Sequence, residues 1–143
     1  MSRFEIKLLD VMVVEGQGLA EGDFELQVKA ILHPGDKAIS WPDIADDPKA
    51  YRKVPRNGGV IAIDRIVDTV EVTGNAKKTF TVDIRLTEVD EDFQGKDDWK
   101  NYSVEFELSE NSGPVTVGPT VTLNRWSAKP KGRVKVRITA RPV

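Results

Sequence analysis

The feature that most constrains this chain is the alternation of apolar and polar residues in four separate runs. Successive side chains of a β-strand point to opposite faces, so each run sends its apolar residues to one face and its polar residues to the other. This pattern predicts antiparallel sheets that bury one face and expose the other to water. The four runs are Phe24–Leu32, Phe80–Leu86, Ser103–Leu108 and Arg133–Ile138.

Further short segments rich in β-branched residues predict more strands, and glycine or proline turn signals separate them. Many short strands with frequent turns are typical of a sandwich or a barrel. A length of 143 residues suits one domain with a sizeable core. We therefore predict a single all-β domain over residues 1–143, an antiparallel two-sheet β-sandwich of about eight strands. The additional strand candidates are Phe4–Val14, Val60–Ile66, Val70–Val72, Val115–Val117 and Val121–Leu123.

The segment Ala38–Arg56 breaks this pattern, because it combines three prolines with aromatic and acidic residues. It predicts a long connection, with a short helical turn near Asp46–Tyr51 that Pro48 would begin.

Composition excludes several classes of protein. A net charge of −2 gives no general attraction to nucleic acid, so no nucleic-acid partner is expected. The absence of cysteine excludes disulfides and thiolate metal sites, and one histidine makes a structural zinc site improbable. No stretch approaches the roughly 20 apolar residues of a membrane span, and the N-terminus carries no apolar signal segment. We expect a cytoplasmic protein, or one exported by a route that needs no cleaved signal, with peripheral association as the expected form of any membrane contact.

Six carboxylates crowd the segment between two of the predicted strands, with Lys96 as the one positive charge among them. Such a concentration of like charges repels itself unless water or a cation screens it. Oxygen ligands without nitrogen or sulfur suit calcium first, and magnesium or manganese next. The alternative is a solvated, charge-rich hairpin that keeps a sheet edge soluble. The six residues are Glu88, Asp90, Glu91, Asp92, Asp97 and Asp98.

The run Asp90–Asp98 spells Asp-x-Asp-x5-Asp directly after an alternating strand. It resembles the third calcium loop of the C2 domain, a β-sandwich that binds calcium and phospholipid. Gly16–Asp23 is similar to the first calcium loop of that family, and Asp23–Val28 to the segment that re-enters the sheet. The resemblance extends over most of the chain, although only the third-loop motif is specific.

This resemblance implies calcium ligands in two loops. Asp90, Asp92 and Asp98 would be the third-loop ligands, and Asp23 with Glu15 or Glu21 the first-loop contribution. Leu19 and Phe93 would be the loop-tip residues that contact a membrane. The first loop lacks an early aspartate at the family's spacing, so the resemblance implies an incomplete or low-affinity Ca²⁺ site. The expected partner is an anionic membrane surface or another protein.

The chain shows no arrangement of residues typical of an enzyme. A Ser-His-Asp arrangement would have to use His33, which we interpret as a turn residue, and no nucleophile-elbow motif accompanies it. We therefore expect a non-catalytic binding module. A structural or adaptor sandwich that acts through protein contacts in a larger bacterial or viral assembly, without calcium, is the alternative.

Two further surface features carry expectations. The last predicted strand places Arg133, Lys135 and Arg137 on one face. This basic face suits contact with an anionic surface. The alternative, which we favour, is a solvated outer face that pairs with Glu105 and Glu107 of another strand. Among the tryptophans, Trp99 is expected to anchor the acidic loop against the core. Trp41 and Trp126 are the candidates for an exposed partner contact.

Overall fold

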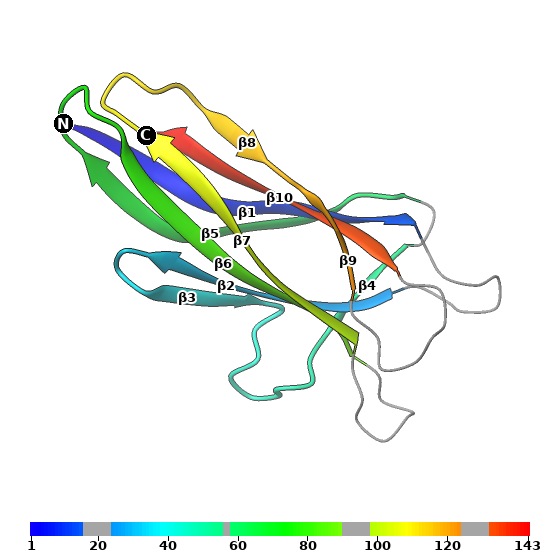
Figure 1. Ribbon diagram of the computed structural model, residues 1–143. Coiled ribbons are helices and arrows are strands. Elements are labelled where there is room, and N and C mark those ends of the chain that lie inside the picture. Colours follow the sequence, from blue (N-terminus) through cyan, green and yellow to red (C-terminus); the bar gives the residue numbers. More distant parts are fainter. Residues whose placement is uncertain (16–23, 56–57, 90–97, 124–131) are drawn as a thin grey trace.

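The computed structural model describes residues 1–15, 24–55, 58–89, 98–123 and 132–143. In these ranges the chain forms ten strands in two antiparallel sheets (Figure 1). The first sheet has the order β5-β1-β10-β8, and β9 also pairs with β10. Its strands are β1 (Ser2–Glu15), β5 (Ile61–Val72), β8 (Val115–Val117), β9 (Thr120–Thr122) and β10 (Arg133–Pro142).

The second sheet has the order β3-β2-β6-β7, and β4 pairs with β2 beyond the end of β3. Its strands are β2 (Phe24–His33), β3 (Lys37–Trp41), β4 (Arg52–Val54), β6 (Lys78–Glu88) and β7 (Asp98–Leu108). The predicted all-β, two-sheet sandwich is confirmed, with two strands more than the eight expected. None of the described segments forms a helix long and apolar enough to cross a membrane.

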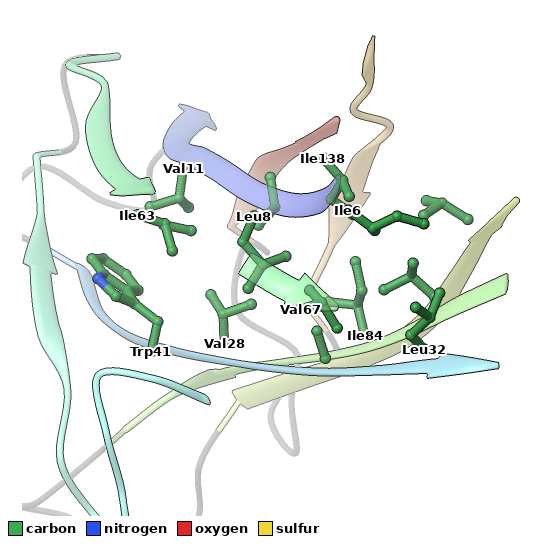
Figure 2. Packing of buried hydrophobic residues seen from close by; sticks show 14 of the residues in the cluster. Ile6, Leu8, Val11, Val28, Leu32, Trp41, Ile63, Val67, Ile84 and Ile138 are labelled. Carbon is green, nitrogen blue, oxygen red and sulfur yellow. The ribbon is translucent and has the colours of Figure 1, made fainter. Parts of the chain in front are cut away.

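The core lies between the two sheets and consists of the apolar positions of the alternating runs (Figure 2). Phe80 and Phe106 are cross-strand partners, as are Val28 and Trp41, and all four side chains point inward and are buried. Burial of each large apolar side chain stabilises the fold by about 1.5–3 kcal/mol. Trp41 therefore belongs to the core, and its predicted role as an exposed partner contact is wrong.

Strand β5 joins two runs that the sequence presented as separate. The pairing of β5 with β1 shifts register between Ile6 and Lys7, where Val67 is the unpaired extra residue. A bulge of this kind moves the following side chains to the opposite face and interrupts the two-residue period. The predicted break between Val60–Ile66 and Val70–Val72 is this bulge, within one continuous strand.

The segment Ala38–Arg56 contributes β4 and most of β3, so it is only partly the connection that the sequence predicted. The predicted helical turn is wrong. Asp47 instead begins a β-turn that ends at Ala50, whose amide donates to the Asp47 carbonyl at 3.1 Å, and the Asp47 side chain accepts from the Lys49 amide at 2.9 Å. Pro48 fixes the second position of a β-turn as readily as the first position of a helix.

Gln27 ties this segment to the sheet. By alternation its side chain points away from the core, yet the residue is only 3% exposed because the segment folds over it. The Gln27 amide nitrogen donates to the carbonyl oxygens of Pro48 and Ala50, at 3.0 and 2.9 Å. One side-chain amide thus satisfies two backbone carbonyls of an irregular segment.

We predict that Gln27→Glu destabilises the protein, because a carboxylate cannot donate to either carbonyl. The expected loss is about 1–3 kcal/mol for each carbonyl oxygen left without a donor. Urea unfolding at pH 7 measures the change. Asn101→Asp is the matched control, since the Asn101 oxygen accepts from Arg85 at 3.0 Å and a carboxylate can do the same. Equal unfolding free energies for the two variants would contradict the role of Gln27.

Candidate functional site

Strand ends from both sheets meet at the end of the sandwich that lies opposite the two chain termini (Figure 1). In the first sheet, β1 ends here at Glu15, opposite Arg133 at the start of β10. In the second sheet, β2 begins at Phe24, β6 ends at Glu88 and β7 begins at Asp98. The strands that flank both predicted calcium loops therefore begin or end at the same end of the molecule.

Three strand ends of the second sheet are direct neighbours. Glu88 of β6 pairs with Leu26 of β2 on one side and with Asp98 of β7 on the other. The Val89 amide donates to the Glu25 carbonyl at 2.8 Å and extends the β2–β6 ladder by one bond. Backbone hydrogen bonds and strand pairing thus position the chain as far as Val89 on one side of the acidic segment and from Asp98 on the other.

The predicted ligands lie mostly beyond these strand ends. Asp23, Asp90 and Asp92 and the predicted membrane contacts Leu19 and Phe93 are outside the described residues. Glu15 and Asp98 are the terminal residues of β1 and β7, and only their backbone is described. Within the described ranges, no three histidine or acidic side chains are grouped to hold a metal ion. The ligand assignment stays a prediction.

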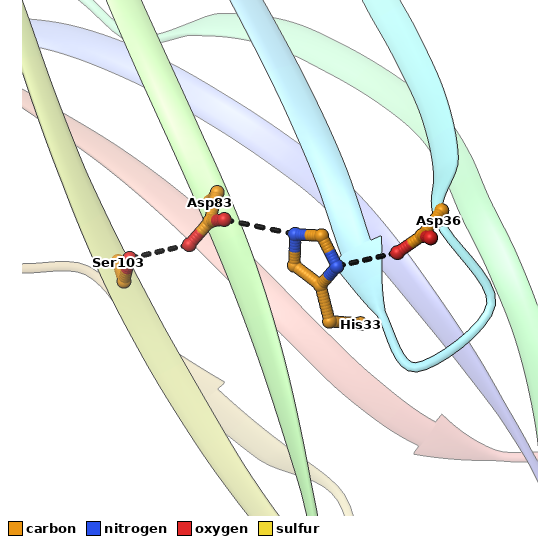
Figure 3. A network of polar contacts seen from close by, with 4 residues as sticks. All are labelled: His33, Asp36, Asp83 and Ser103. Atoms are coloured by element: carbon orange, nitrogen blue, oxygen red, sulfur yellow. Dashed lines mark hydrogen bonds and ion pairs between the residues drawn. The ribbon is translucent and has the colours of Figure 1, made fainter.

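A polar network lies at the other end of β2, on the outer face of the second sheet (Figure 3). His33, the last residue of β2, contacts Asp36 through Nδ1 at 2.6 Å and Asp83 of β6 through Nε2 at 2.8 Å. The Ser103 hydroxyl of β7 donates to the other Asp83 oxygen at 2.5 Å. The network joins the β2–β3 turn to two further strands.

The network shifts the titration of two of its members. The hydrogen bond to Asp36, followed by the contact with Asp83, raises the pKa of His33 above its ordinary value. The Ser103 hydroxyl, followed by the His33 ring, lowers the pKa of Asp83. Both shifts favour the ion pair.

These four residues do not form a nucleophilic triad. Such a triad needs a serine hydroxyl bonded to the imidazole, whereas Ser103 donates to Asp83. His33 does bond to the turn that follows it, as the interpretation as a turn residue suggests. Its partner Asp83 could not be found from the sequence, because the pairing of β2 with β6 sets that contact.

Trp99 lies on the same outer face and not in the core. Its side chain is 38% exposed, and the Arg85 guanidinium lies over its ring at 5.0 Å from the ring centre. The predicted anchoring of the acidic loop against the core by Trp99 is therefore wrong. The alternation explains this, since Trp99 pairs with Thr87, whose side chain points outward. Trp126 is outside the described residues.

The basic last strand has a different neighbour from the one we favoured. In the described part of the chain β10 pairs with β1, β8 and β9, while Glu105 and Glu107 belong to the other sheet. The acidic partner is Asp10 of β1, which is opposite Arg137 and accepts from its Nε at 2.8 Å and from a terminal nitrogen. The predicted pairing with Glu105 and Glu107 is wrong.

A groove of about 570 Å³ opens at the edge where β3 and β5 face each other. Its apolar lining includes Ile31, Ile39, Ile44 and Ile66, and its charged lining residues are Lys29, Asp43 and Arg65. Arg65 of β5 donates to the Ser40 carbonyl of β3 at 3.0 Å, so it bridges the two sheets. Ile31 and Ile66 are 38% and 49% exposed, so the groove offers aliphatic surface to a partner.

No protein-family model and no curated protein sequence matches the chain. Among solved structures, it is similar to a human GIVD cytosolic phospholipase A2 in complex with a fluorophosphonate inhibitor and terbium chloride, with a TM-score of 0.46. That match has 10% identity and covers 99% of this chain, which spans 17% of the length of the enzyme.

The chain is also similar to a C2 domain of a plant extended synaptotagmin 1, with a TM-score of 0.44. This match has 12% identity and covers 99% of this chain and 95% of that domain. At these identities and TM-scores, both likenesses concern the overall fold alone.

Proposed function

We propose that this chain is a non-catalytic, C2-like binding module. Its two acidic segments, the predicted calcium loops Gly16–Asp23 and Asp90–Asp98, take up calcium at the end of the sandwich opposite the termini. Calcium at that end promotes attachment to an anionic membrane surface or to a protein partner. The observation that carries the proposal is the meeting of strand ends from both sheets, which flank both acidic segments (Figure 1).

Covalent neighbours of three proposed ligands support this placement. Asp23 precedes Phe24, the first residue of β2, and Asp90 follows Val89, whose amide bonds to Glu25 of β2. Asp98 is the first residue of β7 and pairs with Glu88. Adjacent strands are about 4.8 Å apart, so a cation can draw ligands from the ends of all three strands.

Charge supports calcium over a purely solvated hairpin. The segment from Glu88 to Asp98 holds six carboxylates and one lysine. Calcium accepts six to eight oxygen ligands in irregular geometry, and carboxylates at strand ends and in loops can supply them. Because the first acidic segment lacks an early aspartate, we propose a site of low affinity, completed by Asp92 and by Glu15 at the end of β1.

The apolar groove at the edge of β3 and β5 favours a second candidate function, an adaptor sandwich that acts through protein contacts without calcium. Four isoleucines contribute to its lining, and two of them are exposed. Exposed aliphatic surface rimmed by polar and charged residues is typical of a surface that contacts a protein.

We predict saturable calcium binding that the double variant Asp90→Asn/Asp92→Asn abolishes, because it removes two charged oxygens from the ligand set. Isothermal titration calorimetry measures the binding. In a parallel thermal-shift assay, millimolar calcium should raise the melting temperature of the wild-type protein but not that of the double variant. Saturation at 100 times the dissociation constant is worth about 2.7 kcal/mol of stability.

Asp46→Asn/Asp47→Asn is the control, because it removes the same charge from the segment that Gln27 holds. It should bind calcium as the wild-type protein does. Absence of heat and of a thermal shift for the wild-type protein would refute the calcium proposal. A calcium-independent oligomer or co-purifying partner in size-exclusion chromatography, lost in Ile66→Lys, would then support the adaptor.

We predict that vesicles containing phosphatidylserine sediment the protein in calcium and release it in chelator. Phe93→Ser should reduce the bound fraction, because it removes the apolar residue proposed to enter the interface. Thr79→Ser, an outward position near the opposite end of β6, is the control and should bind normally. Calcium binding without sedimentation would reject the membrane step and leave a protein partner as the target.

A further inference from the structure

The outer-face network around His33 contains the one side chain of the chain with an ordinary pKa near neutral pH. The sequence has a single histidine and no cysteine. His33 is therefore the side chain whose charge is expected to change between about pH 6 and 8.

The contacts of His33 require a particular protonation state. Nδ1 lies 2.6 Å from an Asp36 oxygen, and Nε2 lies 2.8 Å from an Asp83 oxygen (Figure 3). Ionised carboxylates only accept hydrogen bonds, and a neutral imidazole carries one N–H. Only the imidazolium can donate to both carboxylates at once. In the neutral ring, one nitrogen would direct its lone pair at a carboxylate oxygen.

We propose that His33 is a pH-sensitive clamp: its imidazolium form holds the β2–β3 turn against β6, and loss of the ring proton to solvent releases the turn.

The two carboxylates differ in what holds them. Asp83 belongs to β6 and also accepts from Ser103, whereas the Asp36 side chain is 79% exposed and belongs to a turn. Asp36 and the preceding Gly35 have φ values of 54° and 110°, in the left-handed region, which aspartate adopts less readily than glycine. Asp36 is therefore the partner that departs when the ring becomes neutral.

Other charged groups near the turn are further from the ring. Lys37 follows Asp36 at the start of β3, and Glu105 of β7 is opposite Thr81, the cross-strand partner of His33. On β5, an Asp68 oxygen lies 4.0 Å from the position that a Cβ on Gly35 would occupy. Two carboxylates and one ammonium thus surround the clamp without contacting the imidazole in the structure, and Asp36 and Asp83 remain its direct partners.

Release of the turn would act on the apolar groove. Strand β3 begins one residue after Asp36, and Ala38, Ile39 and Ser40 of this strand line the groove. A turn freed at higher pH would loosen the start of β3 and change that lining. Lower pH would keep the groove in the shape that the structure shows.

The test is an NMR titration of the uniformly labelled full chain from pH 5 to pH 9, in which the single histidine gives an unambiguous ring signal. We expect a midpoint above 6.5, the ordinary value, and the same midpoint in the amide signals of Gly35 and Asp36. Asp36→Asn and Asp83→Asn should each lower the ring midpoint. The clamp's stabilisation should be complete below about pH 6.5 and fade as the pH rises through the midpoint.

Asp46→Asn is the charge-matched control, since it lies in the segment beside Gln27, near the opposite end of β2, and should leave the midpoint unchanged. In His33→Gln, the turn amides should show no transition near the wild-type midpoint. A wild-type midpoint at or below 6.5, or turn amides that do not follow the ring, would overturn the proposal. Both readouts use the wild-type chain, so they do not depend on whether a variant folds.

Discussion

The first sheet depends on the antiparallel pairing of β1 with β10. Strand β1 pairs with β5 on its other side, and β10 carries β8 and β9, so this one ladder unites the two halves of the sheet. It joins residues near the two ends of the chain, as in the pair Phe4 and Pro142. Its formation closes a long loop, which is the costly kind of contact in folding. Arg137 and Asp10 secure the middle of the ladder from outside, while Val136 and Val11 pair on its buried side.

Strand β2 has the corresponding central position in the second sheet, where it pairs with β3, β4 and β6. Both features of functional interest are located by this strand. Its first residues, Phe24 to Leu26, are next to the end of β6, which in turn pairs with the start of β7, and these two strands flank the acidic segment. Its last residue, His33, is the centre of the polar network. The strand ends that flank the acidic segment and the His33 network are far apart in the sequence, and β2 positions both.

The sequence was sufficient to predict the sandwich and most of its strands, because a two-residue period encodes both the strand and its buried face. It did not reveal β3, whose inward residues Ile39 and Trp41 are followed by Pro42 in a proline-containing segment. Nor could it reveal which strands are neighbours. The pairing expected of β10 failed for that reason, since it depended on a partner strand chosen without knowledge of the register. The His33–Asp83 contact escaped prediction on the same ground. The role expected of Trp99 failed because β7 extends back to Asp98, so the alternation that points Val104 and Phe106 inward points Trp99 outward.

The two proposed activities are separated along β2 by a distance that decides how they interact. From Phe24 to His33 the strand advances by about 3.3 Å per residue, which places the acidic end about 30 Å from the imidazole. The Debye length at physiological ionic strength is about 8 Å, so a cation bound at one end contributes almost nothing to the potential at the other. Direct electrostatic coupling between calcium and His33 is therefore excluded at that ionic strength. If calcium does move the titration of His33, the coupling must travel mechanically through β2 and the ladders it shares with β3 and β6.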